Sequence, residues 1–310
     1  MLGGSLHAAF MKQPWLSVFF GLIGCAVTSA SDFATTVAEA TFKIANSTIG
    51  ATCFFVRREA PDSALYLVTA AHFFEEAKEG TATVLLRERG ADGSYQCREY
   101  SIALRRDGKP LWVRHATEDA AVLRLSEPPP VPVAALALSA LADEAGLSAA
   151  GLHICSSVFI LTYPSGFPAQ RTGFFAVARQ GIIASHPLLP VERHRTYLAS
   201  FTTFGGDSGG PVFVGDADGH PVLIGLVVGS FHQDEPVKME YEERTIHHPF
   251  GLGLVLHTQF VREVIEQVAK QAASDSNKKL QSPNKTVQRT GASRSTPETN
   301  QTSSAAGSRR

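Results

Sequence analysis

One stretch constrains this chain more than any other, and it reads Gly205-Gly206-Asp207-Ser208-Gly209-Gly210-Pro211-Val212-Phe213. Glycines allow a positive φ and a close approach of the backbone to another group. The Ser208 hydroxyl is therefore presented on a tight turn, directly before an apolar strand. The N–H groups of Gly206 and Ser208 can converge on one point, which is how an oxyanion hole is built from backbone. This pattern predicts a nucleophilic serine.

Two upstream segments supply partners for such a serine. The apolar run Leu67–Thr69 leads through two alanines to His72, and Asp119 opens a second apolar run, Ala120–Leu125. A serine hydroxyl needs a base within hydrogen-bond reach, and an imidazole held by a carboxylate is the common solution. Each residue alone is ordinary at the end or start of a strand. Together they give the order His, Asp, Ser with spacings of 119 − 72 = 47 and 208 − 119 = 89 residues.

The segments around His72, Asp119 and Ser208 resemble those of the chymotrypsin-like (trypsin-fold) serine peptidases, especially the bacterial trypsin-like branch. The resemblance covers roughly residues 40 to 270. It implies an all-β fold of two six-stranded antiparallel β-barrels with a C-terminal helix. It also implies that His72 is the general base, Asp119 orients its ring, Ser208 is the nucleophile, and the N–H groups of Gly206 and Ser208 form the oxyanion hole.

The hydrophobic pattern divides the chain accordingly. A short linker at 31–39 precedes an N-terminal barrel at 40–126, a connection at 127–151, and a C-terminal barrel with a helix at 152–272. The connection begins with Pro128-Pro129-Pro130-Val131-Pro132, which cannot pair within a central sheet. The segment from His257 to Ala272 has apolar residues at helical spacing. The insertion from His232 to Pro249 is expected to be a solvated loop or an acidic lip that favours basic substrate residues beyond the one before the cleaved bond.

Two alternatives, one of fold and one of function, compete with this interpretation. An α/β-hydrolase also uses Gly-x-Ser-x-Gly, but it needs a helix after the serine and the order Ser, Asp, His. Here Pro211 and an apolar strand follow Ser208. The alternative from another class is a catalytically silent, peptidase-like binding protein. Because all three triad residue types are present, the sequence favours a serine endopeptidase that acts on polypeptides.

Charge is unevenly distributed over the 310 residues, whose formal net charge is −1. Residues 273–310 contain seven Lys or Arg and two acidic residues, so they carry +5 and the rest carries −1 − 5 = −6. A mildly acidic body argues against nucleic acid as the partner. The basic segment 273–310 has no hydrophobic pattern, is rich in Ser, Thr, Asn, Gln and Arg, and is expected to be disordered.

The N-terminal 1–30 residues look like an export signal, since Lys12 precedes an apolar core too short to span a bilayer. Two processing sites compete. Thr28-Ser29-Ala30 suits a signal peptidase, whereas Leu22-Ile23-Gly24-Cys25 resembles a lipobox in which Cys25 is lipidated. The first predicts a periplasmic or secreted protein and the second a membrane-attached one. After processing at Ala30, three cysteines remain, which permit one bridge at most.

Four further predictions concern the substrate pocket and ligands. Thr202 stands where the family has the base of its primary pocket, and Val228, Gly229 and Ser230 are expected to line the wall. Neutral residues there favour a small or medium apolar residue before the cleaved bond. Asp207 pairs with a new N-terminal amine in the trypsin branch; without a matching start here, activity without pro-peptide cleavage is expected. His247-His248 lacks further recognisable ligands, so no metal and no cofactor are predicted.

Overall fold

The computed structural model describes residues 32–59, 64–239 and 242–281. The expected export signal, including Cys25, and the part of the expected tail beyond 281 lie outside the described residues. Within the part of the chain that is described, no helix is both long and apolar enough to cross a membrane. Cys53, Cys97 and Cys155 are all free thiols.

The N-terminal half is a mainly antiparallel sheet with the strand order β5-β4-β1-β2-β3-β9-β8, and β10 adds to β2 in parallel. It has eight strands where six were expected, partly because β10 comes from the connecting segment. The bounds are β1 (Thr41–Ala45), β2 (Gly50–Arg57), β3 (Leu65–Thr69), β4 (Thr81–Arg89), β5 (Tyr95–Ala103), β8 (Trp112–Arg114), β9 (Ala121–Arg124) and β10 (Leu136–Ala137). A separate two-stranded hairpin pairs β6 (Arg105–Arg106) with β7 (Lys109–Pro110).

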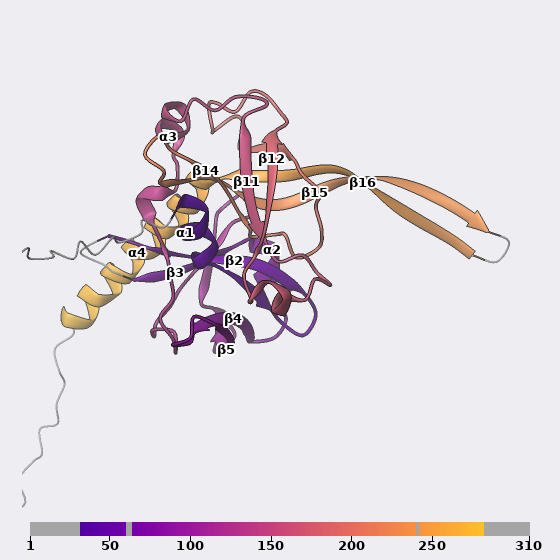
Figure 1. The fold of residues 1–310 in the computed structure, drawn as a ribbon. Helices are drawn as coiled ribbons and strands as arrows, with labels where there is room; N and C mark the ends of the chain where they lie inside the picture. The colour runs from indigo at the N-terminus through magenta and orange to yellow at the C-terminus, as the bar shows by residue number, and fades with distance from the viewer. Residues whose placement is uncertain (1–31, 60–63, 240–241, 282–310) are drawn as a thin grey trace, which may run out of the picture.

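The C-terminal half is a closed barrel in the order β11-β12-β13-β16-β15-β14. Its strands are β11 (Ser157–Thr162), β12 (Val177–Ile183), β13 (Thr196–Ser200), β14 (Pro211–Gly215), β15 (Pro221–Met239) and β16 (Glu242–His257). The two β units with a C-terminal helix confirm the fold class predicted from the sequence (Figure 1).

Strand β2 shows how the two halves share a core. Successive side chains of a strand point to opposite faces. Cys53 and Phe55 accordingly pack in the core of the N-terminal sheet. Phe54 and Val56 pack in a second cluster that also contains residues of the C-terminal barrel, such as Val212. A strand that is buried on both faces therefore holds the halves together.

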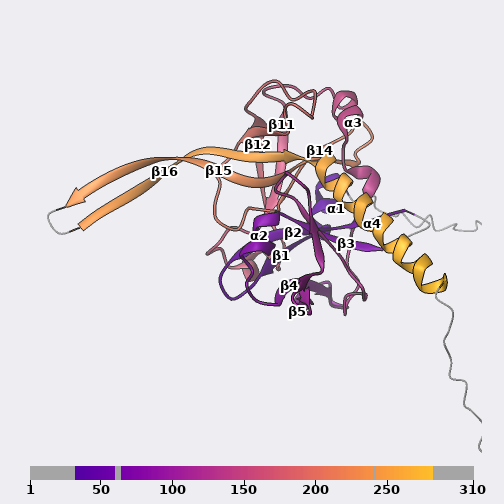
Figure 2. The same ribbon diagram turned by 180° about the vertical axis from the view of Figure 1, so that it is seen from behind.

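Helices join and cover the two β units. They are α1 (Phe33–Ala40), α2 (Ala71–Glu76), α3 (Glu144–Ala149) and α4 (Thr258–Gln281), with 3₁₀ turns η1 (Leu138–Ala140) and η2 (Ala169–Thr172). The predicted apolar face of α4 is confirmed: Phe260, Val261, Val264, Ile265 and Val268 are all buried. Helix α4 packs against β8, β9, β15 and β16, so it bridges both halves (Figure 2).

Three sequence-based expectations about these elements were wrong. The linker at 31–39 is largely helix α1, which Asp32 caps by accepting a hydrogen bond from the Thr35 N–H. The C-terminal helix does not end at Ala272 but continues to Gln281, into the segment expected to be disordered. The insertion from His232 to Pro249 is not a loop, because β15 and β16 pair along it from His232↔Pro249 to Met239↔Glu242. This paired extension, residues 231–239 and 242–250, is called the arm below; it projects from the body (Figures 1 and 2).

A buried arginine ties helix α1 to the rest. The Arg87 guanidinium donates hydrogen bonds to the carbonyl oxygens of Ala38, Glu39 and Thr41, around the end of α1. It also donates to the Tyr163 hydroxyl, which lies just after β11. Carbonyls at a helix C-terminus lack partners within the helix and carry partial negative charge. Arg87 therefore satisfies them and links α1, β4 and the C-terminal barrel.

Candidate active site

Strand pairing brings His72 and Asp119 together. β3 and β9 are antiparallel, with Thr69 opposite Ala121, so the end of β3 lies beside the start of β9. His72 follows β3 in the first turn of α2, and Asp119 precedes β9. The imidazole Nδ1 lies 2.7 Å from Asp119 Oδ2, and the His72 backbone N–H donates to Asp119 Oδ1 at 2.9 Å. The carboxylate therefore fixes both the ring and the backbone of His72.

This contact changes the pKa of both groups. The hydrogen bond that Asp119 accepts from the ring raises the pKa of His72 above its ordinary value, against burial, which lowers it. The nearby charges of Glu75 and Glu76 raise it further. Burial raises the pKa of Asp119, but its hydrogen bonds with His72 and the charge of that ring outweigh burial, so the net shift is downward. The pair is therefore stabilised as carboxylate and imidazolium.

The serine turn needs glycine at two positions. Gly206 and Gly209 have φ of +90° and +85°, a region that side chains other than glycine rarely adopt. A Cβ on Gly209 would lie 2.0 Å from the Thr52 carbonyl oxygen, and one on Gly206 would lie 2.4 Å from that of Tyr163. The turn is therefore packed against the N-terminal sheet and the end of β11 more closely than any side chain permits.

Thr52 on β2 anchors this turn from the other half of the molecule. Its backbone N–H donates to the Ser208 carbonyl at 2.9 Å, and its hydroxyl donates to the Gly206 carbonyl at 2.8 Å. The same hydroxyl accepts from the Tyr163 N–H, and the Thr52 carbonyl accepts from the Thr69 hydroxyl. Among the described residues, the N–H groups of Gly206 and Ser208 donate to no protein acceptor.

His72 and Ser208 line one cavity of about 340 Å³. Its wall combines residues of the N-terminal half, such as Ile49 and Phe73, with Ser165 and Gly206 of the C-terminal half. Within the described part of the chain, no hydrogen bond joins Ser208 to His72. Such bonds are often long before substrate binds. The three expected triad residues thus lie around the seam between the halves, with His72 and Ser208 facing a shared space.

Asp207 is almost fully buried, and its carboxylate is fully used. One oxygen accepts from the Thr162 hydroxyl at 2.8 Å and from Arg179 Nη2 at 2.7 Å. The other accepts from the Phe204 N–H at 2.8 Å. Arg179, on β12, also donates to the Thr202 carbonyl. Asp207 therefore has a cation from within the barrel and needs no free N-terminal amine.

A second cavity of about 310 Å³ opens on the other side of Ser208. Of the four residues predicted to form the substrate pocket, Gly229 and Ser230 line this cavity, whereas Thr202 and Val228 do not. Their neighbours Thr203 and Val227 take those places. Thr202 is exposed, and Val228 packs on the hydrophobic core. His232, His247 and Pro249, from the base of the arm, complete the wall.

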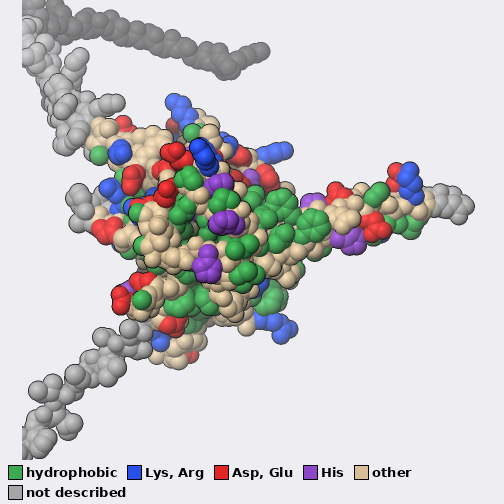
Figure 3. All heavy atoms as spheres, turned by 90° about the horizontal axis from the view of Figure 1, so that it is seen from above, with side chains coloured by type: hydrophobic (Ala, Val, Ile, Leu, Met, Phe, Trp, Pro, Cys, Tyr) green, Lys and Arg blue, Asp and Glu red, His purple; other side chains and the backbone are tan. Residues whose placement is uncertain are grey.

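Histidine and carboxylate groups that can hold a metal gather at the arm (Figure 3). The sequence alone indicated no second metal-ligating residue near His247. In the structure, His232 and Asp234 lie beside it on the arm. His248 points to a different partner, Glu235. A second group, in the turn before β15, contains Asp216, Asp218 and His220.

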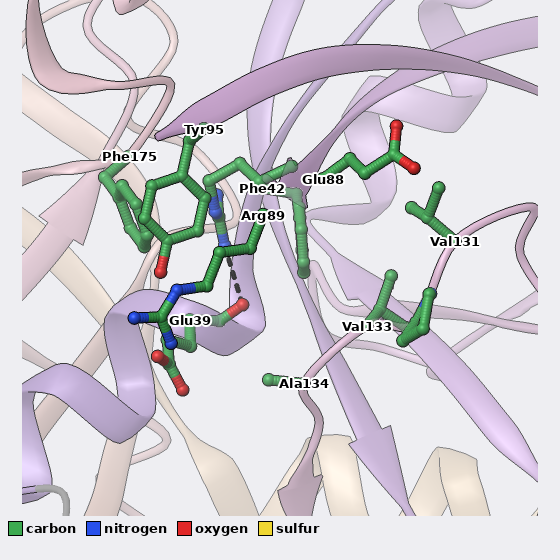
Figure 4. Close-up of a pocket in the computed structure, with 11 residues that line it drawn as sticks. Glu39, Phe42, Glu88, Arg89, Tyr95, Val131, Val133, Ala134 and Phe175 are labelled. Atoms are coloured by element: carbon green, nitrogen blue, oxygen red, sulfur yellow. Dashed lines mark hydrogen bonds between the residues drawn. The ribbon is translucent and has the colours of Figure 1, made fainter. Parts of the chain in front are cut away.

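A further cavity, of about 360 Å³, lies between the N-terminal sheet and the connecting segment (Figure 4). Its lining includes Phe42, Tyr95, Val133 and Phe175, and it contains none of the expected catalytic residues. The Arg87 guanidinium stacks on the Phe42 and Phe175 rings, at 4.2 and 4.3 Å from their centroids. That cation is already engaged by backbone carbonyls, so this cavity is assigned no catalytic role.

Comparison with known proteins agrees with this geometry. A family model described as a trypsin-like peptidase domain matches residues 51–226, which is more than half of the chain. The chain belongs to the trypsin-like peptidase family. The matched span of this trypsin-like peptidase contains His72, Asp119 and Ser208. A search of curated proteins found no match.

Solved structures similar to this trypsin-like peptidase include the inactive form of the Rv3671c protease, at 19% identity and a TM-score of 0.41. That match covers 76% of this chain and 91% of the other. A serine-to-alanine mutant of Rv3671c from M. tuberculosis H37Rv, also in an inactive form, matches at 19% identity and a TM-score of 0.41. It covers 78% of this chain and 96% of that one.

The sequence did not indicate the residues that hold the serine turn in place. Thr52 and Arg179 each contact the serine turn from strands that are distant in sequence. Thr52 lies in an apolar segment before His72, where a threonine is an ordinary β-former and indicates no special role. Arg179 had one available signal: a buried Asp207 requires a positively charged or hydrogen-bonding partner. Nothing in the sequence indicates which arginine that is.

Proposed function

We propose that this peptidase is a serine endopeptidase that hydrolyses peptide bonds through an acyl-enzyme on Ser208. The observation that carries the proposal is the 2.7 Å contact between His72 and Asp119 at a cavity that His72 shares with Ser208. An imidazole that is held by a carboxylate beside a serine on a glycine turn is the arrangement that nucleophilic catalysis requires.

The chemistry follows from the roles of these groups. The Ser208 hydroxyl attacks the carbonyl carbon of the substrate while its proton passes to His72 Nε2. Asp119 keeps the Nδ1–H tautomer and stabilises the imidazolium that forms. His72 then gives the proton to the leaving amine, and the peptide C–N bond breaks. A water molecule, activated by the same imidazole, hydrolyses the ester and restores Ser208.

The oxyanion is assigned to the N–H groups of Gly206 and Ser208. Two features support this role: both groups lack a protein acceptor among the described residues, and Thr52 holds the Gly206 and Ser208 carbonyls of the turn. Preorganised donors of this kind typically contribute about 10²–10³ each in rate.

Activity is expected without cleavage of a pro-peptide. The Arg179–Asp207 pair supports this proposal, because the carboxylate beside Ser208 is already neutralised inside the barrel. Isolation of an inert precursor that gains activity only when its chain is nicked would contradict it.

The proposed substrate is an extended polypeptide with a small or medium apolar residue before the cleaved bond. The cavity beside Ser208 is lined by Val227, Gly229 and Ser230. Among its described lining residues the acidic group is Asp207, whose charge Arg179 balances. Such a cavity gives a lysine or arginine side chain no free carboxylate. We further propose that the protein acts after export, either released or held by a lipidated Cys25.

An unbiased peptide-library digest tests this function. Wild-type protein should cleave internal peptide bonds, and Ser208→Ala should lower kcat by at least about 10⁴-fold. The matched control Ser94→Ala changes an exposed hairpin serine and should cleave like wild type. Well-folded wild-type protein that cleaves no peptide, or Ser208→Ala protein that cleaves normally, would overturn the proposal; the first result would favour a silent binding protein.

A further inference from the structure

The arm presents three metal-ligating side chains on one face. Asp234 and His247 are directly opposite each other in the β15–β16 pairing, and His232 lies two residues before Asp234. Residues two apart in a strand share a face, and directly opposed residues do too. Gln233 and His248 form the next pair, so their side chains lie on the other face. All three ligating residues are exposed.

The ligand atoms converge without rearrangement of the backbone. His232 Nε2 lies 3.1 Å and His247 Nδ1 lies 2.6 Å from Asp234 Oδ1. One ligating atom from each residue lies within 4.8 Å of the others. Zinc bonds to nitrogen and oxygen of about 2.0–2.2 Å at tetrahedral angles separate ligand atoms by roughly 3.4 Å. Small rotations of exposed side chains therefore reach zinc geometry.

From this cluster we infer a site for Zn²⁺ at the base of the arm, formed by His232, Asp234 and His247. Two imidazoles and one carboxylate are a donor set that suits zinc, and the set leaves a fourth position for water. The ion would bind the two ring nitrogens that now lie closest to Asp234 Oδ1. It would also tie β15 to β16 where the arm leaves the barrel.

The location couples this site to the cavity beside Ser208. His232 and His247 both line that cavity, together with Ser230 and Pro249. An ion bound by both rings would hold the side chains of His232 and His247 in place. It would also narrow the opening through which a substrate side chain enters the cavity. Zinc therefore raises KM for peptide substrates and leaves kcat nearly unchanged. This second statement rests on the proposed peptidase activity, whereas zinc binding itself does not.

The second group of possible metal ligands, Asp216, Asp218 and His220, differs from the site on the arm. Asp216 Oδ1 accepts hydrogen bonds from the backbone N–H groups of Asp218 and His220. That carboxylate is therefore committed to its own turn, and the turn does not contribute to the cavity beside Ser208. His248 provides a second contrast, because it lies on the arm but contacts Glu235 instead.

Zinc binding is tested on the full chain carrying Ser208→Ala, which separates binding from catalysis. Competition against a chromophoric zinc chelator should give one tight site, and Co²⁺ should give the visible bands of a tetrahedral ion. In this background His232→Ala and His247→Ala should each weaken zinc binding by more than about 100-fold, since even loss of an outer partner costs 10–100-fold. His248→Ala and His220→Ala should bind like the parent. No binding by the parent, or equal losses in the control variants, overturns the site.

The coupling is tested by steady-state kinetics of wild-type protein with and without one equivalent of Zn²⁺. We expect KM to rise and kcat to stay within about twofold, with no change in KM for His247→Ala. An equal response of His247→Ala and wild type would contradict the coupling. A wild-type protein that binds zinc but cleaves no peptide under any condition would contradict the proposed function and leave the metal site standing.

Discussion

At the scale of single residues, the site depends on charges that are balanced locally. His72 is matched by Asp119, and Asp207 is matched by Arg179. The first pair is about one-third exposed and the second is mostly buried. Substitutions in the two pairs should therefore have different effects. A change in the first pair should impair proton transfer by His72, and a change in the second should disturb the fold of the serine turn.

The His72–Asp119 contact sets the pH dependence of activity. A general base works when neutral, and Asp119 raises the pKa of His72. Activity should therefore rise with pH along an acid limb whose midpoint lies above the ordinary histidine value. Asp119→Asn removes the anion, so the midpoint should move to lower pH and kcat should fall by about 10⁴-fold, as in serine peptidases of this fold. Profiles of kcat/KM against pH check this; equal midpoints in the two proteins would contradict it.

Removal of Arg179 should disturb the serine turn. Arg179→Met leaves Asp207 buried without its cation, a change that costs about 3–5 kcal/mol of unfolding free energy in buried pairs. We expect kcat to fall more than KM changes, because the oxyanion donors belong to the same turn. The double variant Arg179→Met with Asp207→Asn should recover part of the stability.

The control for this prediction is Arg98→Met, which breaks the exposed pair with Glu88 on β4. Exposed pairs contribute about 0–1 kcal/mol, so this variant should unfold like wild type. Denaturant titration and steady-state kinetics measure both effects. If Arg179→Met and Arg98→Met behave alike, Arg179 has no positioning role.

At the scale of elements, the serine turn is held by a strand from the other half of the molecule. The Thr52 hydroxyl bridges the Gly206 carbonyl and the Tyr163 N–H. Both groups would be left without partners in a buried position if the hydroxyl were absent. Strand β2 thus joins the halves by hydrogen bonds at the site as well as through the shared core.

Thr52→Val keeps the shape and removes both hydrogen bonds. Each of the two buried polar groups that loses its partner costs about 1–3 kcal/mol, so unfolding free energy should fall by about 2–6 kcal/mol and kcat/KM should drop. Thr52→Ser retains the hydroxyl and should recover most of both. Thr83→Val, on the partly exposed β4, should stay within about 0.5 kcal/mol of wild type. A Thr52→Val protein with wild-type stability and activity would show that the anchor is dispensable.

The sequence predicts elements that have their own hydrophobic pattern. It does not predict elements that form only through pairing with residues far away in the chain. The apolar runs that became β3, β9 and β14, and the helical period of α4, are readable because burial repeats along the chain. The arm was missed because its exposed strands have no buried face and therefore no alternating pattern. The proposed zinc ligands were missed for a different reason: His232 and His247 are neighbours only once the β15–β16 register is known.

At the scale of the whole molecule, stability should depend on pH through a buried histidine between barrel and helix. His257 is the last residue of β16 and is fully buried, and its ring packs at a tilt against the Tyr197 ring, at a centroid distance of 4.9 Å. Burial lowers its pKa to about 4, against backbone groups of His194 and Leu188, which raise it. The folded protein thus holds this ring neutral at pH values where the unfolded chain protonates it.

Acid should therefore destabilise the fold through His257. The unfolded chain binds a proton near pH 6.5 and the folded chain only near pH 4, so unfolding free energy falls as pH drops through this range, by about 3 kcal/mol in total. His72 has the opposite shift, so the comparison must be made between wild type and His257→Leu. Urea titrations between pH 7 and 4 should show a smaller loss of stability in the variant. Parallel curves for the two proteins would contradict this prediction.

In the proposed mechanism, Ser208 is a nucleophile that His72 activates across the seam between the two halves. Intact-mass and peptide-mapping measurements after treatment with a fluorophosphonate test it most directly. We predict one adduct per chain, on Ser208, that is lost in Ser208→Ala, forms far more slowly in His72→Ala, and forms normally in Ser94→Ala. Folded wild-type protein that stays unmodified, or carries its adduct on another serine, would contradict the account.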